Sequence, residues 1–361
     1  MNIGVTKVKH NEPFTTESGY TFPELELAYK TWGTLSKDKT NVALVCHAFS
    51  GHAAADEWLA ACFGEGKMLD PSKHFILCIN IIGSCYGSTG PRSINPETGK
   101  VYGSTFPNLT IRDMVRAHQI ILDLLEIEEV EFAFGASMGG MQALEFAVMD
   151  KRIKQLILVA MGKAHSPWAI GISEAQRQAI YADANWNNGD YPDHKPPAKG
   201  LAAARMMAML TYRSPHSFQR RFSRDLQDDS GLYKVESYLR YQGLKMADRF
   251  DALTYVRLSE AMDTHDISRG RGSSKSVLGK IKVPALVIGI DSDLLYPVSE
   301  QKELAELLGN GYFIEMDAPH GHDSFLIEFQ NMQKIVKDFR DNNKRSDYNP
   351  KDKDFEHLSN E

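Results

Sequence analysis

Short, almost continuously apolar runs alternate along this chain with segments of helical period, and this alternation constrains the fold more than any other feature. Four of the runs are bounded by turn residues: Asn41–Phe49, His74–Ile82, Val130–Phe134 and Ile153–Met161. Such runs are typical of strands buried on both faces. Because intervening helices place successive strands in parallel, the chain predicts an α/β fold with a mostly parallel central sheet and helices on both faces.

The alternation is interrupted in the middle of the chain. Residues 166–280 are polar and mostly helical in pattern, and the strand–helix rhythm returns at Lys282–Ile290. We therefore expect an α/β core of residues 1–165 and 281–342 that carries a helical lid of residues 166–280. Residues 343–361 contain almost no apolar side chains, so a disordered tail is expected there.

Two helices of the predicted core can be located from the sequence. The stretch Thr110–Ile127 repeats its apolar residues at helical spacing, and Thr110 is suited to the N-cap. The stretch Asp323–Phe339 predicts the final helix.

Charge and composition argue against several classes of partner. The 361 residues are 42% hydrophobic and carry a net charge of -6, with a pI near 6.1. This gives no electrostatic reason to expect nucleic acid or an anionic membrane. No apolar run reaches about 18 residues and no signal-peptide core is present, which favours a soluble cytoplasmic protein. The cysteines form no C-x-x-C pair, so reduced and buried thiols are expected at Cys46, Cys62, Cys78 and Cys85.

The stretch "FGASMGGMQ" places Ser137 among small residues, between an apolar run and a helical one. Its G-x-S-x-G pattern is that of a nucleophile elbow, in which a sharp strand-to-helix turn presents the serine and tolerates only small neighbours. The N–H of Met138 would then lie at a helix N-terminus, where it can stabilise an oxyanion. Taken alone, the pentapeptide fits a tight turn with a bystander serine equally well.

Candidate partners for Ser137 follow it in the order acid, then histidine. One predicted strand is followed by Asp291 and Asp293, and the next by His320 and His322. Loops at the carboxyl ends of parallel strands meet at one edge of the sheet. A histidine there would activate the serine hydroxyl, and an aspartate would orient the imidazole and stabilise its charged form. This order predicts a Ser–Asp–His triad.

The second oxyanion donor is expected in the loop Cys46–His52, which follows the first long strand. The N–H of Phe49 is the candidate, and His47 is expected to be structural.

Competing sites have weaker patterns. The letters "HGHD" resemble part of an H-x-H-x-D-H metal site, but the last histidine and a third ligand cluster are missing, so no metal is expected. No P-loop or dinucleotide-binding glycine motif follows a predicted strand. The letters "RGRGSS" are expected to form a solvated linker.

Four longer blocks carry a specific resemblance: "NIIGSCYGSTGPRSINPETGKVYG", "FPNLTIRDMVRAHQ", "GASMGGMQALEFA" and "HGHDSFL". Together they resemble the homoserine O-acetyltransferase family of α/β-hydrolase-fold enzymes, from about Phe14 to Phe339. The resemblance implies ping-pong transfer of an acyl group from an acyl-CoA, through Ser137, to the hydroxyl of L-homoserine in methionine biosynthesis. It implies acetyl-CoA as co-substrate and no tightly bound cofactor.

The resemblance also implies roles for single residues. The family pattern aligns the triad acid with Asp293 rather than Asp291, and the base with His322 rather than His320. Asp323 matches a position that holds the ammonium group of the substrate.

Arg205 and Tyr212 match substrate-binding positions of the family. Their spacing of seven residues is close to two helical turns, so both project from one face. An arginine fork suits a substrate carboxylate. Arg213 is a rival for that carboxylate, and an interhelical ion pair stays open for Arg205.

The chain departs from the family in its oxyanion loop, where "HAFSG" replaces the common "HALTG". Phe49 is bulkier than leucine, so acetyl is favoured over succinyl as the acyl group. Homoserine and serine differ by one methylene, worth about 1–3 kcal/mol in a pocket. Serine O-acetyltransferase, homoserine O-succinyltransferase and an esterase or hydrolase stay open as alternatives, and a non-catalytic binding protein is a further one.

The predicted lid carries enough apolar residues in Glu236–Asp263 to bury a second face. The family resemblance implies a homodimer joined through such helices. A homodimer through lid helices is therefore expected, with small-molecule substrates and no nucleic acid or membrane partner.

Overall fold

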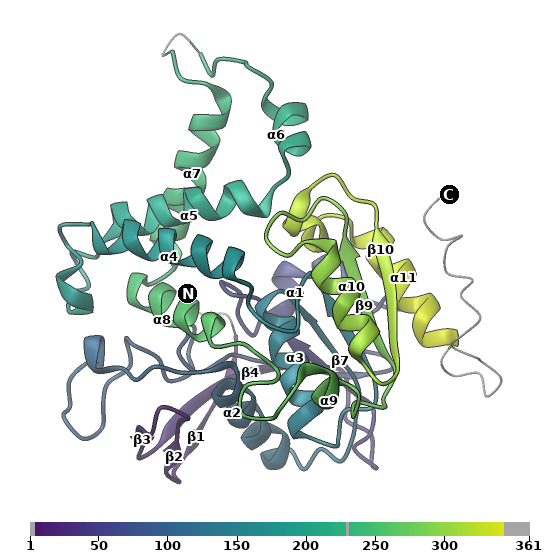
Figure 1. Cartoon of the computed structure of the whole chain (residues 1–361). Helices are drawn as coiled ribbons and strands as arrows, with labels where there is room; N and C mark the ends of the chain where they lie inside the picture. Colours follow the sequence, from purple (N-terminus) through teal and green to yellow (C-terminus); the bar gives the residue numbers. More distant parts are fainter. Residues whose placement is uncertain (1–3, 229–230, 343–361) are drawn as a thin grey trace.

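An eight-stranded sheet forms the centre of the fold (Figure 1). The structure is a computed structural model that describes residues 4–228 and 231–342, so the tail expected at 343–361 lies outside the described residues. The sheet order is β1-β4-β6-β5-β7-β8-β9-β10, antiparallel among β1, β4 and β6 and parallel from β6 to β10. The strands of this sheet are β1 (Thr6–His10), β4 (Leu25–Trp32), β5 (Val42–Cys46), β6 (Phe75–Ile79), β7 (Val130–Ala136), β8 (Leu156–Val159), β9 (Ala285–Ile290) and β10 (Gly311–Met316).

The mostly parallel sheet confirms the prediction from the alternating pattern, whereas the antiparallel edge was not predicted. A separate two-stranded sheet is formed by β2 (Phe14–Thr15) and β3 (Thr21–Phe22).

Alternate residues of the central strands enter two separate apolar cores on opposite faces of the sheet. In β5, Val42 and Leu44 belong to one core, and Ala43 and Val45 belong to the other. Helices on both faces contribute to these cores, as predicted. The first face is covered by α2 (Ile111–Leu124) and α3 (Met138–Met149), and the second by α1 (Ala55–Trp58), η1 (Ala60–Cys62) and α11 (Phe329–Asn342).

The helix α2 begins at the predicted N-cap. The N–H of Asp113 donates to Thr110 Oγ1 (3.2 Å), and the N–H of Thr110 donates to the carboxylate of Asp113 (3.0 Å). This reciprocal pair satisfies two amides that the first helical turn leaves free.

The prediction of one final helix over Asp323–Phe339 is wrong. The chain forms the 3-10 helix η4 (Gly321–Leu326) and then α11, which starts at Phe329. The Ile327 N–H closes the last 3-10 turn on the Ser324 carbonyl (3.0 Å), and Ile327 itself has φ -126° and ψ -49°, outside the helical region, which separates the two helices.

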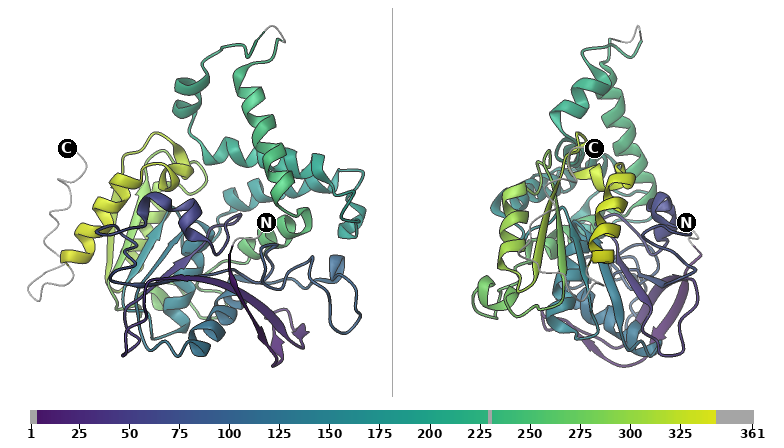
Figure 2. Two further views of the ribbon diagram at one scale, coloured as in Figure 1. Left: turned by 180° about the vertical axis from the view of Figure 1, so that it is seen from behind. Right: turned by 90° about the vertical axis from the view of Figure 1, so that its right-hand side faces the viewer.

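Between β8 and β9 the chain is helical, as expected. Figures 1 and 2 show α6 and α7 extending away from the sheet, while α8 lies closer to it. The division between lid and core at residues 166 and 280 stays a prediction. The helices of this segment are α4 (Pro167–Tyr181), η3 (Asn187–Gly189), α5 (Ala198–Tyr212), α6 (Pro215–Phe222), α7 (Lys234–Arg249), α8 (Ala252–Asp263) and α9 (Ser274–Leu278), and η2 (Gly103–Thr105) and α10 (Val298–Leu307) belong to the flanking parts.

All four cysteines are free, which confirms the prediction of thiols, and Cys46, Cys62 and Cys78 are buried as expected, whereas Cys85 is only half-buried. Burial raises the pKa of the Cys46 and Cys62 thiols to about 12, so both stay protonated at neutral pH. Among the described residues, no helix has both the length and the apolar character that a membrane crossing requires.

Candidate active site

Ser137 lies in the turn between β7 and α3, at φ 54° and ψ -127°. A non-glycine residue with such a backbone stores about 1–3 kcal/mol of strain. The neighbouring glycines are required by close backbone contacts. A Cβ atom at Gly135 would lie 2.1 Å from the carbonyl oxygen of Gly139, and one at Gly139 would lie 2.1 Å from that of Cys46. The turn therefore accounts for both glycines of the G-x-S-x-G motif.

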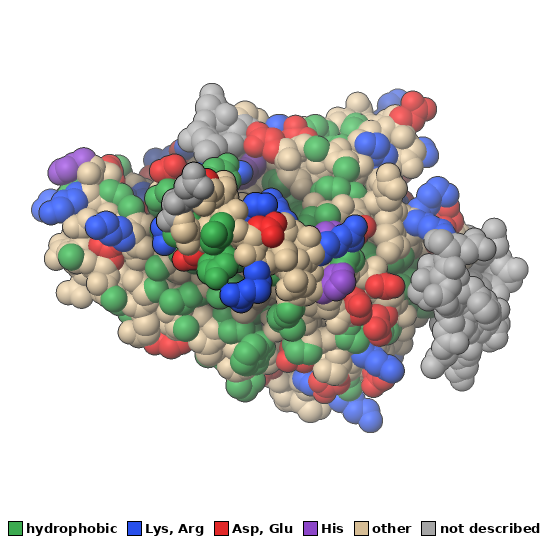
Figure 3. All heavy atoms as spheres, turned by 90° about the horizontal axis from the view of Figure 1, so that it is seen from above, with side chains coloured by type: hydrophobic (Ala, Val, Ile, Leu, Met, Phe, Trp, Pro, Cys, Tyr) green, Lys and Arg blue, Asp and Glu red, His purple; other side chains and the backbone are tan. Residues whose placement is uncertain are grey.

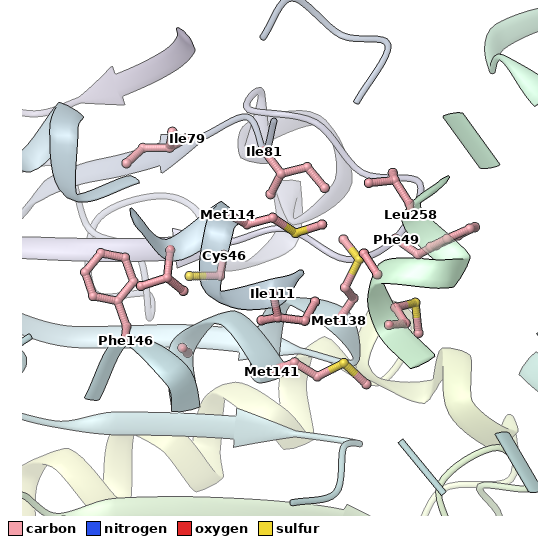
Figure 4. Close-up of a cluster of buried hydrophobic side chains, with 14 of the residues drawn as sticks. Cys46, Phe49, Ile79, Ile81, Ile111, Met114, Met138, Met141, Phe146 and Leu258 are labelled. Atoms are coloured by element: carbon pink, nitrogen blue, oxygen red, sulfur yellow. The ribbon is translucent and has the colours of Figure 1, made fainter. Parts of the chain in front are cut away.

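Met138 and Phe49 both bring a backbone amide to this region. Met138 is the first residue of α3, so its N–H has no acceptor within the helix. Phe49 lies in a turn closed by a hydrogen bond from the Gly51 N–H to the Ala48 carbonyl (2.8 Å), which does not use the Phe49 N–H. Figure 4 shows both side chains within one buried apolar cluster.

The turn containing Phe49 is tied to the start of α3. Gln142 is fully buried, and its Nε2 donates to the carbonyl oxygens of His47 and Met138 (3.1 Å each). The ring of His47 accepts from the Ile81 N–H at Nε2 (3.2 Å), and its Nδ1 lies 2.9 Å from the Ala48 carbonyl. Burial lowers the pKa of His47 to about 4, so the ring is neutral and holds the loop, as expected for a structural histidine.

His322 and Asp293 form a buried hydrogen-bonded pair. The Nδ1 of His322 lies 2.8 Å from Oδ2 of Asp293, and the side chains are 3% and 0% exposed. The other carboxylate oxygen accepts from the amides of Leu295 and Tyr296 (2.8 and 3.0 Å). Burial lowers the pKa of His322, but the charge and hydrogen bond of Asp293 outweigh it, so the pKa is raised above 6.5.

The rival residues of these two loops make other contacts. An Asp291 carboxylate oxygen accepts from the Ala318 N–H (2.9 Å), which joins the loops that follow β9 and β10. His320 Nε2 lies 3.3 Å from the carboxylate of Glu328. The structure therefore pairs Asp293 with His322.

Three aromatic rings enclose the His322 imidazole. The ring centroids of Tyr212, Tyr296 and Phe325 lie 5.5, 5.5 and 5.6 Å from it. Tyr212 is the last residue of α5, so the helical segment reaches the imidazole directly. Tyr296 was not singled out from the sequence, although it lies in the "DSDLLYP" loop beside Asp293. Its hydroxyl lies 2.9 Å from Nδ1 of His165, a contact across 131 residues that no local pattern indicates.

Asp323 lies next to the two candidate arginines. Its carboxylate forms an ion pair with Arg213 (Nε to Oδ2, 3.2 Å), and Arg205 stacks its guanidinium over the Tyr212 ring at 5.2 Å. Burial raises the pKa of Asp323, while the charges of Arg205 and Arg213 oppose that shift. The structure brings these four residues together with His322, and it does not select one arginine for a substrate carboxylate.

A metal centre is not apparent in the described part of the chain. No group of three or more His, Cys, Asp or Glu side chains is arranged there to hold a metal ion. The histidines of "HGHD" pair instead with carboxylates, His320 with Glu328 and His322 with Asp293.

The elbow turn after β7 and the Asp–His pair after β9 and β10 place the chain in the α/β-hydrolase class of proteins. Residues 42–329 match the model of the family described as alpha/beta hydrolase fold.

Similarity to individual proteins shows which family within this class the chain belongs to. The homoserine O-acetyltransferase of Chlorobium chlorochromatii (strain CaD3) is 53% identical over 333 residues, 91% of this chain and 93% of that protein. A solved homoserine O-acetyltransferase from Bacillus anthracis superposes with a TM-score of 0.85 at 26% identity, over 93% of this chain and 97% of the other. A solved esterase, E22, has a TM-score of 0.83 at 27% identity, over 93% and 99%. The chain belongs to the homoserine O-acetyltransferase family.

Proposed function

We propose that this protein transfers an acetyl group from acetyl-CoA to the hydroxyl of L-homoserine by way of an acetyl-enzyme on Ser137. The observation that carries the proposal is the 53% identity to a curated homoserine O-acetyltransferase over nearly the whole of both chains. The buried Asp293–His322 pair and the elbow turn at Ser137 provide the chemistry for it.

In the first half of the reaction, His322 takes the proton of the Ser137 hydroxyl as Ser137 Oγ attacks the thioester carbonyl. The amides of Met138 and Phe49 would stabilise the resulting oxyanion. Asp293 holds the imidazole by Nδ1 and stabilises its charged form. The thiolate of CoA leaves with the proton from His322, and the acetyl group stays on Ser137.

In the second half, His322 takes the proton of the homoserine hydroxyl, whose oxygen attacks the acetyl ester. The tetrahedral intermediate collapses, the proton returns to Ser137, and O-acetylhomoserine leaves. Asp323 would hold the substrate ammonium group, and Arg205 or Arg213 its carboxylate. Tyr212 would complete this subsite next to His322.

Transfer rather than hydrolysis is supported by the burial of the site. Ser137, Asp293 and His322 are only 5%, 5% and 3% exposed. The helical segment contributes Tyr212 to the cover over the imidazole. A covered acyl-enzyme is shielded from water, and binding of an amino acid beside it favours attack by the amino acid hydroxyl. The esterase E22, which shares the fold, makes hydrolysis the second candidate.

Incubation with acetyl-CoA, with and without L-homoserine, separates the two. Transfer predicts CoA release that depends on homoserine and an equal amount of O-acetylhomoserine. CoA release at the same rate without any acceptor would establish a hydrolase. Running the same assay with succinyl-CoA and with L-serine identifies the acyl group and the acceptor.

We also propose a homodimer joined through α5 and α7. Exposed apolar side chains recur at a spacing of three on both helices, and α5 and α7 pack on each other. Figure 3 shows this end of the molecule, where apolar side chains are interspersed among charged ones. Apolar residues exposed in such a group are typical of an interface: Met207 (40% exposed), Leu210 (52%), Tyr241 (60%) and Leu244 (62%).

A further inference from the structure

Arg249, the last residue of α7, joins the helical segment to the turn that contains Phe49. Its Nη1 donates to the Ser50 carbonyl (3.0 Å) and to the Tyr86 hydroxyl (2.8 Å), and its Nη2 donates to Ser50 Oγ (3.1 Å). The Tyr86 hydroxyl donates in turn to the Arg249 carbonyl (3.0 Å). One side chain therefore connects three segments that are far apart in the sequence.

Ser50 directly follows Phe49 in the turn closed by Ala48 and Gly51. Both the carbonyl and the hydroxyl of Ser50 bond to the same guanidinium, so the orientation of this half of the turn is fixed by Arg249. Phe49 and Ser50 are the two central residues of this turn, so the backbone of Phe49 lies between the hydrogen bond that closes the turn at Ala48 and the contacts of Ser50 with Arg249. The direction of the Phe49 N–H therefore depends on where Ser50 is held.

The next residue of the helical segment supports the same turn. The Phe250 ring packs against Phe49 and Tyr86, with centroids 6.3 and 5.8 Å away. Tyr255 from α8 meets Phe49 edge-on at 4.7 Å. The turn is thus held from the helical segment by hydrogen bonds at Ser50 and by aromatic packing at Phe49.

We propose that Arg249 is a positioning residue that keeps the Phe49 amide aimed at the oxyanion during acylation of Ser137. This inference rests on the proposed function, because it assumes that Ser137 is acylated. Hydrogen bonds from a charged donor are stronger than neutral ones. Oxyanion donors work best when they do not have to reorient during the reaction, so a fixed turn raises the rate of acylation.

A second role for the same arginine needs to be separated from this one. Arg249 also lines a cavity of about 300 Å³ with Tyr86, Tyr191 and Phe250, where a guanidinium could meet an anionic group of acetyl-CoA. Nη1 already bonds to Ser50 and Tyr86, and Nη2 bonds to Ser50, which favours positioning. Loss of a substrate contact would raise the KM for acetyl-CoA, whereas loss of positioning lowers the acylation rate at saturating substrate.

The test compares Arg249→Met with a control, Arg240→Met, which makes the same change at an exposed position of α7. Among the described residues, the Arg240 side chain forms an ion pair only with Glu236. The burst of p-nitrophenol from p-nitrophenyl acetate reports acylation of Ser137 without an amino acid acceptor. We expect Arg249→Met to slow the burst by about 10–100-fold. Inhibition by 1,1,1-trifluoroacetone should weaken by a similar factor, because the adduct of this ketone with the Ser137 hydroxyl mimics the tetrahedral intermediate. The KM for acetyl-CoA should change by less than about threefold, and Arg240→Met should match the wild type.

A normal burst in folded Arg249→Met, or a raised KM with a normal burst, would overturn the proposal. If Arg249→Met does not fold, Tyr86→Phe removes the hydroxyl that supports Arg249 and keeps the ring. It should slow the burst by about 3–10-fold, and an unchanged burst would overturn the proposal. A wild-type enzyme that gives the burst but makes no O-acetylhomoserine would refute the proposed function and leave the positioning role standing.

Discussion

Nδ1 of His322 lies 2.8 Å from Oδ2 of Asp293, inside a site where neither side chain is more than 3% exposed. Each partner satisfies a buried polar group of the other, so removing either would leave an unpaired atom. The pair joins the ends of β9 and β10, and Asp293 is fixed in turn by the amides of Leu295 and Tyr296.

Asp293→Asn should lower kcat by about 10³–10⁴-fold, because an amide neither fixes the imidazole tautomer nor stabilises its charged form. The pH profile should move as well. His322 acts as a base only when neutral, so wild-type kcat/KM rises as pH increases through its raised pKa. Without the Asp293 charge the pKa of His322 falls, and the rise should shift to lower pH. Asp291→Asn, at the carboxylate bound to the Ala318 amide, is the control and should leave the profile in place.

Ser137→Gly should remove activity and stabilise the protein. Ser137 has φ 54°, a conformation that glycine adopts without strain, so a gain of about 1 kcal/mol in the free energy of unfolding is expected. Ser137→Ala should be equally inactive without that gain, because alanine keeps the Cβ atom. Denaturant unfolding of the three proteins measures the difference. Residual CoA release by Ser137→Ala near the wild-type rate would show that the nucleophile is a different residue.

Asp323→Asn should raise the KM for the amino acid by about 10–100-fold and that for acetyl-CoA by less than about threefold, because only the amino acid carries an ammonium group. Steady-state kinetics with each substrate varied in turn gives both values. Equal effects on the two constants would refute the role of Asp323.

Arg205→Met and Arg213→Met address the carboxylate of the same substrate. Arg213 already forms an ion pair with Asp323, whereas Arg205 stacks on Tyr212. The variant with the larger rise in KM for homoserine identifies the carboxylate partner.

Leu210→Glu and Leu244→Glu should convert a dimer to a monomer, because each places a charge within the exposed apolar group on α5 and α7. Light scattering after size exclusion measures the mass. Leu124→Glu is the matched control, since Leu124 is 57% exposed on the core helix α2. A wild-type protein that is monomeric at every concentration would rule out the proposed interface.

The sheet and the order of the candidate site residues could be predicted because they depend on local patterns. Continuous apolar runs indicate buried strands, and Ser137, Asp293 and His322 each follow one of them, so the parallel sheet brings their loops to one edge. The family resemblance selected Asp293 and His322 from two pairs of candidates.

Other features depend on contacts that no local pattern shows. The final helix is broken at Ile327, whose φ of -126° and ψ of -49° lie outside the helical region, although the segment has a helical pattern throughout. Tyr296 reaches His165 across 131 residues, and Arg249 reaches Ser50 across 199. Such partners become visible only when the loops and the helical segment are placed over the sheet.

The most direct test is to isolate the acetyl-enzyme and present it with an acceptor. The protein is mixed briefly with acetyl-CoA, freed from CoA by gel filtration, and analysed by mass spectrometry of the Ser137 peptide. We predict one acetyl group on Ser137 that persists in buffer and moves quantitatively to L-homoserine when that amino acid is added. An acetyl group lost to water at the same rate with and without homoserine, or found on another residue, would contradict transfer through Ser137.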